Sequence, residues 1–486
     1  MSFPAPFLAR VEALLPPAER EPFLHWCTAP LPKSFRLTQR AAYAAPPAAW
    51  HAQQTLLPRT HLLPRPATAA EKVRLGNTLE HFSGEVYSAT LSSLLDVYAL
   101  GDIRGWKVLD LCAAPGSKTT LLSQMVGPEG LVVANEPSSS RLQKLASNIE
   151  RLGCQNVILT QWNGAKLRQY TESEFDLVLV DAPCSSEGHG RKDSSFFSQM
   201  WSERSILTAA RLQQQLIEEA LLALRVGGIL HYSTCTTAPE ENECIVAGLL
   251  ARYPGAVTVL PPHLPAGLPH AKGVTQWQGQ GIPPEVSEHY TRLYPHLRSE
   301  MWDSECFGMI TLQKTAPTTS RAEKQTSLHP PQLLKKQEKA RIITQLYKRF
   351  GIPKEALRPY SLLQTPQGVW LTTALGAGFL RRSIVNRPGM PLLDANNHLT
   401  HSAAMALGAL ATAQLYPLTD AQYGRWLQGY DLLDVALPWP DSSEVLVHYR
   451  GRCVGLGRVM EGGKKLKNKL PRTLTLAQPV TYEGDS

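Results

Sequence analysis

Short apolar runs alternate with longer amphipathic segments between Asn77 and Leu312. The short runs predict buried strands, and apolar residues recurring three and four positions apart predict helices. Strands are expected at 106–111, 131–134, 157–160, 175–180 and 229–233, and helices at 117–125, 138–152, 203–225 and 240–252. This order predicts an α/β fold, a doubly wound, Rossmann-like parallel sheet with right-handed crossovers.

The regions on either side differ in composition. Pro and Ala dominate much of the stretch before residue 75, whereas Lys, Gln and Pro dominate the stretch after Lys314, which favours a flexible connector. The C-terminal part alternates strand-like runs with Gly-bearing turns, so a small β-rich domain is expected. The predicted boundaries are an N-terminal module at 1–75, a catalytic domain at 76–313, a linker at 314–338, an intermediate domain at 339–399 that opens on a basic helix, and a β-rich domain at 400–486.

Composition excludes some classes of protein. The chain of 486 residues has no apolar stretch long enough to span a bilayer, and charged residues interrupt its first segment, so we expect a cytoplasmic protein without a secretory signal. Its eight cysteines form no C-x-x-C pair, which argues against a disulfide framework and a metal site. A net charge of +8 is compatible with a polyanionic partner but does not establish one.

Two cysteines follow predicted strands. Cys184 lies in Asp181-Ala182-Pro183-Cys184-Ser185, and Cys235 lies in Tyr232-Ser233-Thr234-Cys235-Thr236. Ligands of open α/β sheets bind at the carboxyl ends of the strands, so both thiols are expected to face one crevice. Two thiols there suggest a reaction in which a covalent bond to the enzyme is made and then broken. The alternative is that both are small buried hydrophobes, which is the role expected for the other cysteines near apolar runs.

The segment from Cys112 to Thr119 follows the first predicted strand of this sheet. Its small residues allow a ligand close to the backbone, and a helix begins where they end. It has neither the G-x-G-x-x-G nor the P-loop spacing, so a nicotinamide cofactor or a nucleoside triphosphate is disfavoured. Glu136, at the end of the next strand, is placed to accept hydrogen bonds from a ribose, or else to complement the start of a helix.

Together these motifs resemble the Nol/Nop/Sun family of RNA cytosine-5 methyltransferases, which use S-adenosylmethionine. The resemblance rests on the 112–118 loop, Glu136, the motif from Asp181 to Gly188, and Ser233-Thr234-Cys235-Thr236 with the acids that follow. It covers most of the segment from residue 77 to residue 312. The tail from Gly455 to Arg472 is similar to the PUA-like domain of bacterial 16S rRNA methyltransferases.

The resemblance implies methylation of carbon 5 of a cytosine in 16S rRNA or the small ribosomal subunit. It implies that Cys235 attacks carbon 6, that Cys184 helps expel the enzyme, and that Asp181 stabilises charge on the ring nitrogen side. In a DNA cytosine-5 methyltransferase the Pro-Cys motif supplies the nucleophile, which would make it Cys184 instead. The implied cofactor-binding residues are Cys112, Ala113, Ala114, Pro115, Gly116, Ser117, Lys118, Glu136, Asn163 and Asp181.

Some positions depart from the family pattern. Asn163 stands where Asp is usual, although its amide oxygen can still meet an adenine amino group. Ser117 and Ser186 replace glycines, and because serine is small, little effect is expected. Asp303-Ser304-Glu305-Cys306-Phe307 stands in place of Gly-Glu-Gly-His-Phe at the far wall of the pocket.

Five basic residues are candidates for RNA contact: Arg191, Lys192, Lys464, Lys465 and Lys467. Each group could equally be a solvated surface cluster or tail. Two other functions remain open on the sequence. One is an RNA-binding assembly factor that kept the fold without catalysis, and the other is a dehydrogenase, which the missing glycine fingerprint disfavours.

Overall fold

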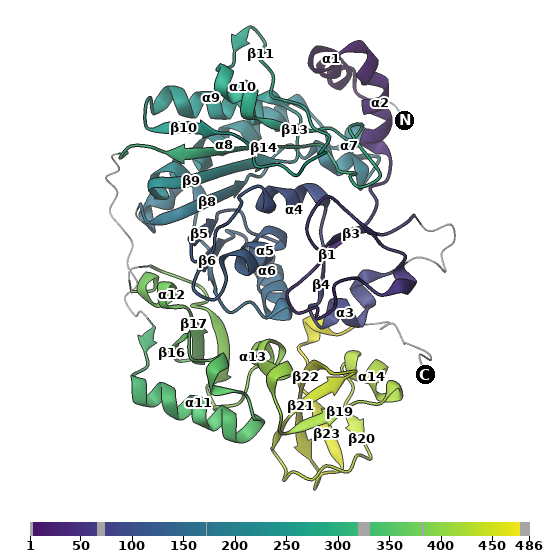
Figure 1. Cartoon of the computed structure of the whole chain (residues 1–486), viewed down its shortest axis with the longest axis vertical. Coiled ribbons are helices and arrows are strands. Elements are labelled where there is room, and N and C mark those ends of the chain that lie inside the picture. The colour runs from purple at the N-terminus through teal and green to yellow at the C-terminus, as the bar shows by residue number, and fades with distance from the viewer. Residues whose placement is uncertain (1–2, 66–72, 172, 319–330, 382, 477–486) are drawn as a thin grey trace.

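The computed structural model describes residues 3–65, 73–171, 173–318, 331–381 and 383–476 (Figure 1). Its helices are α1 (Ala5–Leu14), α2 (Pro17–Thr28), α3 (Leu79–Phe82), α4 (Leu91–Tyr98), α5 (Ser117–Val126), α6 (Ser139–Leu152), α7 (Phe196–Gln199), α8 (Glu203–Ala223), α9 (Glu243–Arg252), α10 (Pro284–His289), α11 (Lys336–Phe350), α12 (Ala374–Phe379), α13 (His401–Leu407) and α14 (Asp420–Leu427). In these ranges no helix has the length and apolar character needed to cross a membrane.

An eight-stranded sheet forms the middle of the molecule, in the order β10-β14-β9-β8-β5-β6-β7 with β13 paired to β14. Its strands are β5 (Lys107–Asp110), β6 (Leu131–Asn135), β7 (Val157–Thr160), β8 (Phe175–Asp181), β9 (Leu224–Thr234), β10 (Val257–Leu260), β13 (Thr291–Leu293) and β14 (Phe307–Lys314). Strands β5 to β9 pair in parallel, whereas β14 is antiparallel to β9. The predicted Rossmann-like sheet is confirmed, with an antiparallel edge added to its parallel centre.

Alternation along the strands divides the core between the two faces of this sheet. Val108 and Val132 pack with the apolar residues of α4, α5 and α6. The next residues along the chain, Leu109 and Val133, pack with α8 and α9 on the other face. Strand residues point alternately to opposite faces, so apolar runs that are buried on both sides produce this double-sided core.

Helix α8 ends earlier than its sequence suggests. The sequence predicts a helix over 203–225 that the following pair Gly227-Gly228 would end, but the helix stops at Ala223 and the glycines lie inside β9. Gly227 has φ +82°, and the pairing of β8 with β9 shifts register between Phe175 and Leu177. The prediction was wrong because the glycines serve an irregular start of the strand rather than the helix end.

A small sheet accompanies the N-terminal helices, in the order β2-β3-β1-β4. Its strands are β1 (Ser34–Leu37), β2 (Gln53–Gln54), β3 (Thr60–Leu62) and β4 (Val86–Ser88). Residues 319–330, about half of the predicted connector at 314–338, lie outside the described ranges. Within its ends, β14 continues to Lys314 and α11 already begins at Lys336.

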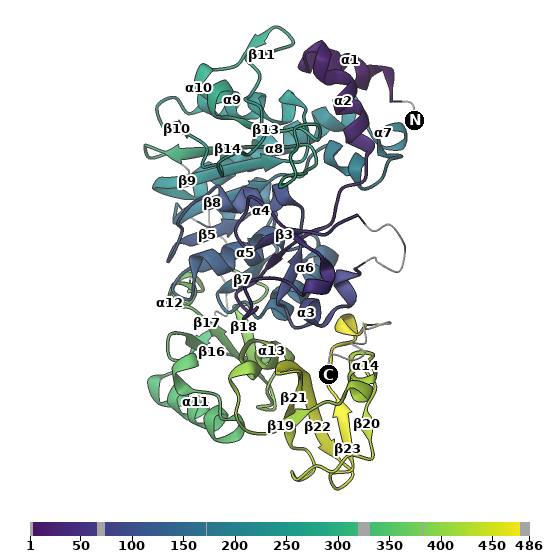
Figure 2. The same ribbon diagram turned by 45° about the vertical axis from the view of Figure 1, so that its right-hand side comes forward.

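The C-terminal part contains two further sheets, β15-β16-β17-β18 and β19-β21-β22-β23-β20. Their strands are β15 (Gln332–Leu333), β16 (Ser361–Thr365), β17 (Gly368–Thr372), β18 (Met390–Asp394), β19 (Leu415–Pro417), β20 (Leu432–Leu433), β21 (Glu444–Tyr449), β22 (Arg452–Met460) and β23 (Lys465–Asn468). The predicted β-rich C-terminal domain is confirmed. Both views place it at the end of the molecule away from α1 and α2 (Figures 1 and 2). Leu79 and Phe82 of α3 pack into its core, and Arg452 of β22 forms an ion pair with Glu85 at 2.5 Å.

Candidate active site

Cys184 and Cys235 meet at the carboxyl ends of two neighbouring strands. Strands β8 and β9 are parallel and place Asp181 beside Ser233, so the segments that follow leave the sheet at one edge. The two Sγ atoms lie 3.1 Å apart, and both residues are partly exposed free cysteines. The expectation that both thiols face one site is thus met by the geometry.

Buried acids hold the two cysteine segments together. Glu241 accepts from the Ser185 amide at 2.9 Å and from Gln213 at 2.8 Å. Glu187 accepts from the Thr237 amide at 2.8 Å, and the Gly188 amide donates to the Cys235 carbonyl at 2.9 Å. These bonds cross between the segments after β8 and β9, so they fix the separation of the thiols.

Ser186 has φ +63°, a left-handed conformation that glycine adopts most readily. The backbone conformation, and not side-chain size, is therefore what distinguishes serine from glycine at this position. Serine is small enough for this position, but the backbone is strained.

The 112–118 loop joins β5 to α5 at the same edge of the sheet. Ala113 and Ala114 are buried, Cys112 is half-buried and Pro115 is exposed. Gly116 has φ +110°, and a Cβ there would lie 3.0 Å from the Leu145 side chain, so glycine is required. Burial is the main cause that raises the pKa of the Cys112 thiol, with the nearby Asp181 carboxylate adding to it.

Asn135 binds three strand ends together, a role that the sequence did not reveal. Its amide nitrogen donates to the carbonyls of Leu111 and Trp162 at 3.1 and 3.3 Å, while its oxygen accepts from the Trp162 amide at 2.7 Å. It thereby fixes how β5, β6 and β7 end around the loop.

The predicted cofactor-binding side chains line up along this edge. Glu136, after β6, is buried and accepts from the Ser138 amide at 2.9 Å, with Arg141 at 3.4 Å. Asn163, after β7, is exposed, and its oxygen accepts from the Ala165 amide at 3.1 Å. Asp181, the last residue of β8, is one-third exposed at 34%. The three residues therefore flank the 112–118 loop from successive strands.

Lys118 connects the loop to the base of the cysteine segments. Its Nζ lies 2.6 Å from Asp181 Oδ2 and 3.5 Å from Oδ2 of Asp96, a residue of α4. Burial opposes the charge of Lys118, but the nearby carboxylates outweigh it and raise the pKa of its ammonium. Burial raises the pKa of Asp110, at the end of β5, to about 7.

The structure corrects the prediction for Arg191. This residue is 3% exposed, forms an ion pair with Asp303, and donates to the carbonyls of Ser304 and Ala29 at 2.8 and 2.9 Å. Contact with RNA phosphate would break bonds that join α2, the cysteine segment and the segment before β14. Arg191 therefore has a structural role, whereas its neighbour Lys192 is exposed.

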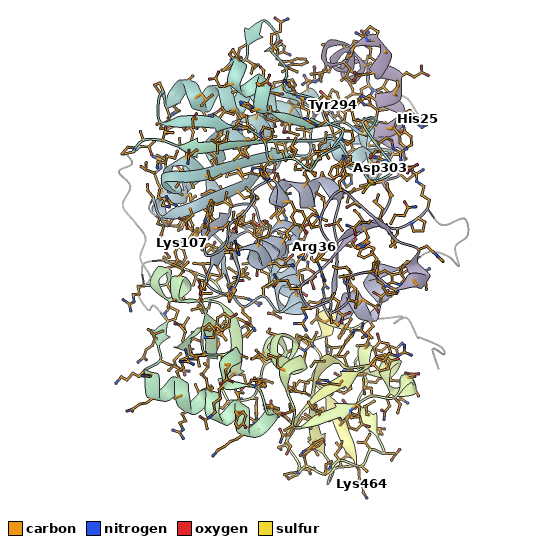
Figure 3. All side chains as sticks on the ribbon, in the orientation of Figure 1. His25, Arg36, Lys107, Tyr294, Asp303 and Lys464 are labelled. Atoms are coloured by element: carbon orange, nitrogen blue, oxygen red, sulfur yellow. The ribbon has the colours of Figure 1, made fainter. Side chains whose placement is uncertain are left out.

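The tail lysines lie far from this site. Lys464 lies at the lower end of the molecule in Figure 3, whereas Asp303, the ion-pair partner of Arg191, lies in its upper half. Lys464 and Lys467 are exposed, whereas Lys465 is half-buried with Asp431 and Glu461 at 3.4 and 3.5 Å. RNA contact at the tail remains a prediction for all three lysines, and Lys465 already has two acidic neighbours.

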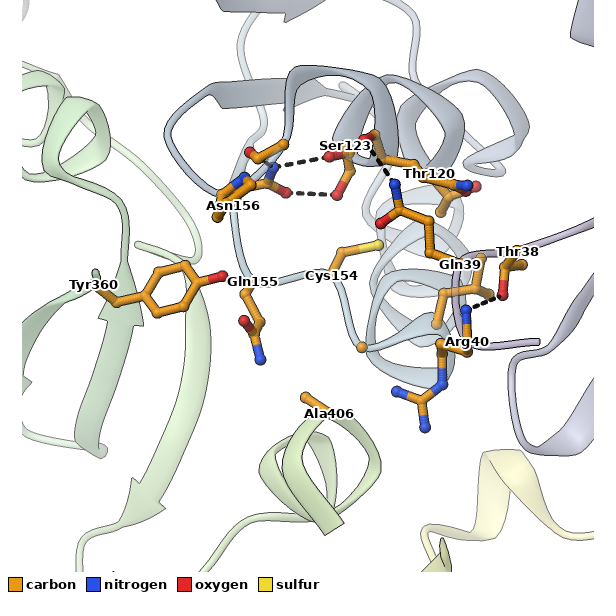
Figure 4. A pocket seen from close by; sticks show the side chains of 15 residues that line it. Thr38, Gln39, Arg40, Thr120, Ser123, Cys154, Gln155, Asn156, Tyr360 and Ala406 are labelled. Atoms are coloured by element: carbon orange, nitrogen blue, oxygen red, sulfur yellow. Dashed lines mark hydrogen bonds between the residues drawn. The ribbon is translucent and has the colours of Figure 1, made fainter. Parts of the chain in front are cut away.

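A cavity of about 250 Å³ lies elsewhere, between the N-terminal module, α5, α6 and the C-terminal part (Figure 4). Thr38, Asn156, Tyr360 and Ala406 are among its lining residues, and Arg40 is the only charged one. Neither of the paired cysteines nor any residue of the 112–118 loop lines it, so this cavity is separate from the candidate active site.

Besides Asn135, the sequence reading missed Asp96 and His231. Asp96 is the charged residue of a helix that otherwise holds apolar residues, two serines and a tyrosine, and His231 is a polar residue within a strand expected to be apolar. Those two interruptions were the available signal. Among the described residues, no group of three or more His, Cys, Asp or Glu side chains has a geometry that could hold a metal ion.

Comparison with known proteins assigns the chain to a family. Residues 97–300 match the family described as "16S rRNA methyltransferase RsmB/F", and residues 413–476 match "Methyltransferase RsmF PUA domain". A solved structure from Pyrococcus horikoshii, a methyltransferase homologue, is 26% identical with a TM-score of 0.52, and the match covers 64% of this chain and 95% of that one.

Curated relatives match over most of their length. Ribosomal RNA small subunit methyltransferase F of Aeromonas salmonicida is 34% identical over 84% of this chain and 82% of its own. The Vibrio cholerae protein of the same name is 32% identical over 98% of both chains. With this agreement in sequence and domain order, the chain belongs to the ribosomal RNA small subunit methyltransferase F family.

Proposed function

We propose that the protein transfers a methyl group from S-adenosylmethionine to carbon 5 of a cytosine in 16S rRNA through a covalent bond to Cys235. The observation that carries this proposal is the pair of thiols 3.1 Å apart at the ends of β8 and β9, in the segments that contain Asp181 and Ser233. A methyltransferase that adds a group to oxygen or an exocyclic nitrogen has no need of two thiols at its target site.

The residues at the sheet edge suit the cofactor. The 112–118 loop carries small residues and has no room for a side chain at Gly116, and Glu136 and Asn163 offer oxygens at successive strand ends. Oxygens so placed accept from ribose hydroxyls and from an adenine amino group. Arg141 lies 3.4 Å from one oxygen of the same Glu136 carboxylate. When bound, S-adenosylmethionine supplies the methyl group as an electrophile.

The remaining chemistry belongs to side chains of this protein. The Cys235 thiolate attacks carbon 6 of the base, and Asp181 delivers a proton to the ring nitrogen that gains charge, so carbon 5 becomes nucleophilic. After carbon 5 has taken the methyl group, water removes its proton. The electrons of that C–H bond restore the ring double bond, the bond between carbon 6 and sulfur breaks, and the proton on the ring nitrogen returns to Asp181.

The surroundings of Cys184 favour its thiol form. A hydrogen bond with Cys235, together with burial, raises the pKa of Cys184 well above its ordinary value. Cys184 therefore stays a thiol, and its S–H can donate to the Cys235 sulfur when that sulfur carries charge. A thiol at Cys184 that can donate in this way suits the residue that assists the departure of Cys235.

The proposal is tested by deleting each thiol. Cys235→Ala should abolish formation of 5-methylcytosine and leave no covalent adduct with 16S rRNA, because no thiolate attacks. Cys184→Ala should accumulate a covalent protein–RNA complex, because release of the sulfur is impaired. Mass spectrometry of digested RNA and denaturing gels of the mixture measure the two outcomes.

Cys244→Ala is the matched control, since Cys244 is another half-buried cysteine and lies on α9, away from the crevice. It should methylate as the parent does. If Cys235→Ala rather than Cys184→Ala accumulates the covalent complex, then Cys184 is the nucleophile and Cys235 assists release. A parent protein that binds S-adenosylmethionine but yields no 5-methylcytosine would refute the proposed reaction.

A further inference from the structure

A chain of buried polar groups continues from Asp181 into the protein. Lys118 Nζ lies between Asp181 Oδ2 at 2.6 Å and Asp96 Oδ2 at 3.5 Å. On the other side of Asp96, Oδ1 lies 2.9 Å from His231 Nε2. The side chains of Asp96, His231 and Lys118 are at most 8% exposed, whereas that of Asp181 is 34% exposed. Only the Asp181 end of this chain is open to a substrate.

The fold explains why these groups meet. His231 and Ser233 are two residues apart on β9, so their side chains point to the same face of the sheet. Helix α4 covers that face, and Asp96 accepts from Ser233 Oγ at 2.8 Å as well as contacting His231. The second ring nitrogen of His231 lies 2.9 Å from the hydroxyl of Thr311, its direct cross-strand partner on β14.

The number of charges limits how these groups can ionise. Three carboxylates, those of Asp96, Asp110 and Asp181, surround the single ammonium of Lys118. With all three ionised, the group would carry two uncompensated negative charges, which is costly in a buried site. Protons must therefore bind at the carboxylates with the weakest hydrogen bonding.

Hydrogen bonding shows which carboxylate keeps its charge. Asp96 accepts hydrogen bonds from His231 and Ser233 and also faces the Lys118 ammonium. Asp181 forms an ion pair with Lys118 but has only a long contact of 3.4 Å with Ser233. One oxygen of Asp110 accepts from Thr119, and the other has no partner. Donors that bind the ionised form of a carboxylate favour that form, so Asp96 is the permanent anion.

The pKa directions agree with this assignment. Burial alone would raise the pKa of Asp96, but Lys118, His231 and Ser233 outweigh it, and the pKa falls below its ordinary value. Burial is the main cause that raises the pKa of Asp181. Lys118 opposes that rise, and the negative charge of Asp96 adds to it. Asp110 and Cys112 are the other titratable groups that face Asp181.

We propose that Asp96 and His231 are positioning residues. The Asp96 carboxylate, held by His231, balances the charge of Lys118 on its buried side. Asp181 can therefore hold the proton that it gives to the base. This inference rests on the proposed function for the identity of the proton acceptor. His231 acts as a neutral donor: Nε2–H donates to Asp96, and Nδ1 accepts from Thr311. In this state Asp96 balances Lys118, and with both Asp110 and Asp181 protonated no buried charge is left uncompensated.

The test removes the charge of Asp96 and keeps its shape. In Asp96→Asn, Lys118 has Asp181 as its remaining close anion, so Asp181 should lose its proton more readily. The single-turnover methylation rate should fall at high pH as Asp181 loses its proton. In Asp96→Asn this high-pH limb of the rate profile should move to lower pH by about one pH unit. Asp102→Asn is the matched control, because Asp102 is exposed and pairs only with Arg104 on the surface. It should leave the limb in place.

A second readout does not depend on methylation. With aspartate labelled at the carboxyl carbon with carbon-13, the Asp181 signal is identified by its loss in Asp181→Asn. Its titration midpoint should lie above the ordinary range in the parent and fall in Asp96→Asn. If the parent does not methylate cytosine but this midpoint falls, the proposed function is wrong and the present inference stands. A midpoint that stays in place refutes the inference.

Two more variants complete the test. His231→Gln keeps a neutral donor to Asp96, so it should leave the limb and the midpoint unchanged, and a shift would overturn the neutral role of His231. If Asp96→Asn does not fold, the double variant Asp96→Asn with His231→Gln removes the same charge while its two amides can bond to each other. It should show the same downward shift, and an unshifted midpoint there would equally refute the inference.

Discussion

The buried ion pair between Glu243 and Arg292 allows a quantitative test of how the active-site segment is held. Arg292 Nε and Nη2 donate to the two oxygens of Glu243 at 2.6 and 2.5 Å, and the side chains are 0% and 2% exposed. Burial opposes the charge of Arg292, but Glu243 outweighs it and raises the pKa of the guanidinium. Arg292 Nη1 also donates to the Thr237 carbonyl at 2.8 Å, two residues beyond Cys235.

Glu243→Gln should strongly destabilise the protein because it leaves the guanidinium buried without a counter-charge. The expected loss is about 3 to 5 kcal/mol in the free energy of unfolding. Replacing both partners, in Glu243→Gln with Arg292→Met, should cost less than Glu243→Gln alone, because no unpaired charge then remains. Urea unfolding of the full chain, followed by circular dichroism, measures the order of the midpoints.

The exposed pair of Lys272 and Glu288 supplies the control for this comparison. Its side chains are 63% and 57% exposed, so Glu288→Gln should not shift the urea midpoint. The reasoning fails if Glu243→Gln unfolds within about 1 kcal/mol of the parent, below the range expected for a broken buried pair. It also fails if the double variant is less stable than Glu243→Gln.

Two further predictions concern the C-terminal domain and helix α3, which packs against it. Burial lowers the pKa of His81 to about 3 and of His401 to about 4. Below pH 6.5 the unfolded chain therefore binds protons that the folded chain does not. The free energy of unfolding should fall on acidification, by about 1 kcal/mol for each histidine at pH 5.5. Thermal unfolding between pH 7.5 and 5.5 measures this, and His401→Phe should lose less stability than the parent over that range; an equal loss would contradict the assignment. Neutralising Lys464 and Lys467 should weaken binding to 16S rRNA and flatten its dependence on salt, measured by filter binding at several salt concentrations, whereas neutralising Lys465 should have less effect because Asp431 and Glu461 already face it. An unchanged salt slope in the first variant would exclude phosphate contact there.

The sequence predicts the parallel part of the fold well because it depends on local patterns. Each central strand is a short apolar run with a helix after it, and the loop after β5 and both cysteine segments directly follow such runs. The antiparallel edge was not predicted, because the pairing of Phe307–Lys314 with Leu224–Thr234 joins distant segments and has no local signature.

The candidate site shows the same division between local and distant contacts. Residues in recognisable motifs, such as Cys184 and Cys235, are found close together, as expected. Arg191 was read as a possible surface charge, and it is buried because Asp303, 112 residues further along the chain, pairs with it. Asp96 was missed for a related reason, since its three donors come from β9 and α5, and nothing beside it in the sequence indicates them.

Helix α3 affects how the C-terminal domain can be studied in isolation. Its Leu79 and Phe82 fill part of the core around Trp426 and Val445, although they lie more than 300 residues earlier in the chain. A fragment restricted to residues 413–476 lacks these side chains and exposes the apolar surface that they cover. During synthesis that surface has its partner ready, because α3 has already left the ribosome when β21 emerges. The C-terminal domain thus needs side chains from the first fifth of the chain to complete its core. Its RNA affinity should therefore be measured on the full-length protein.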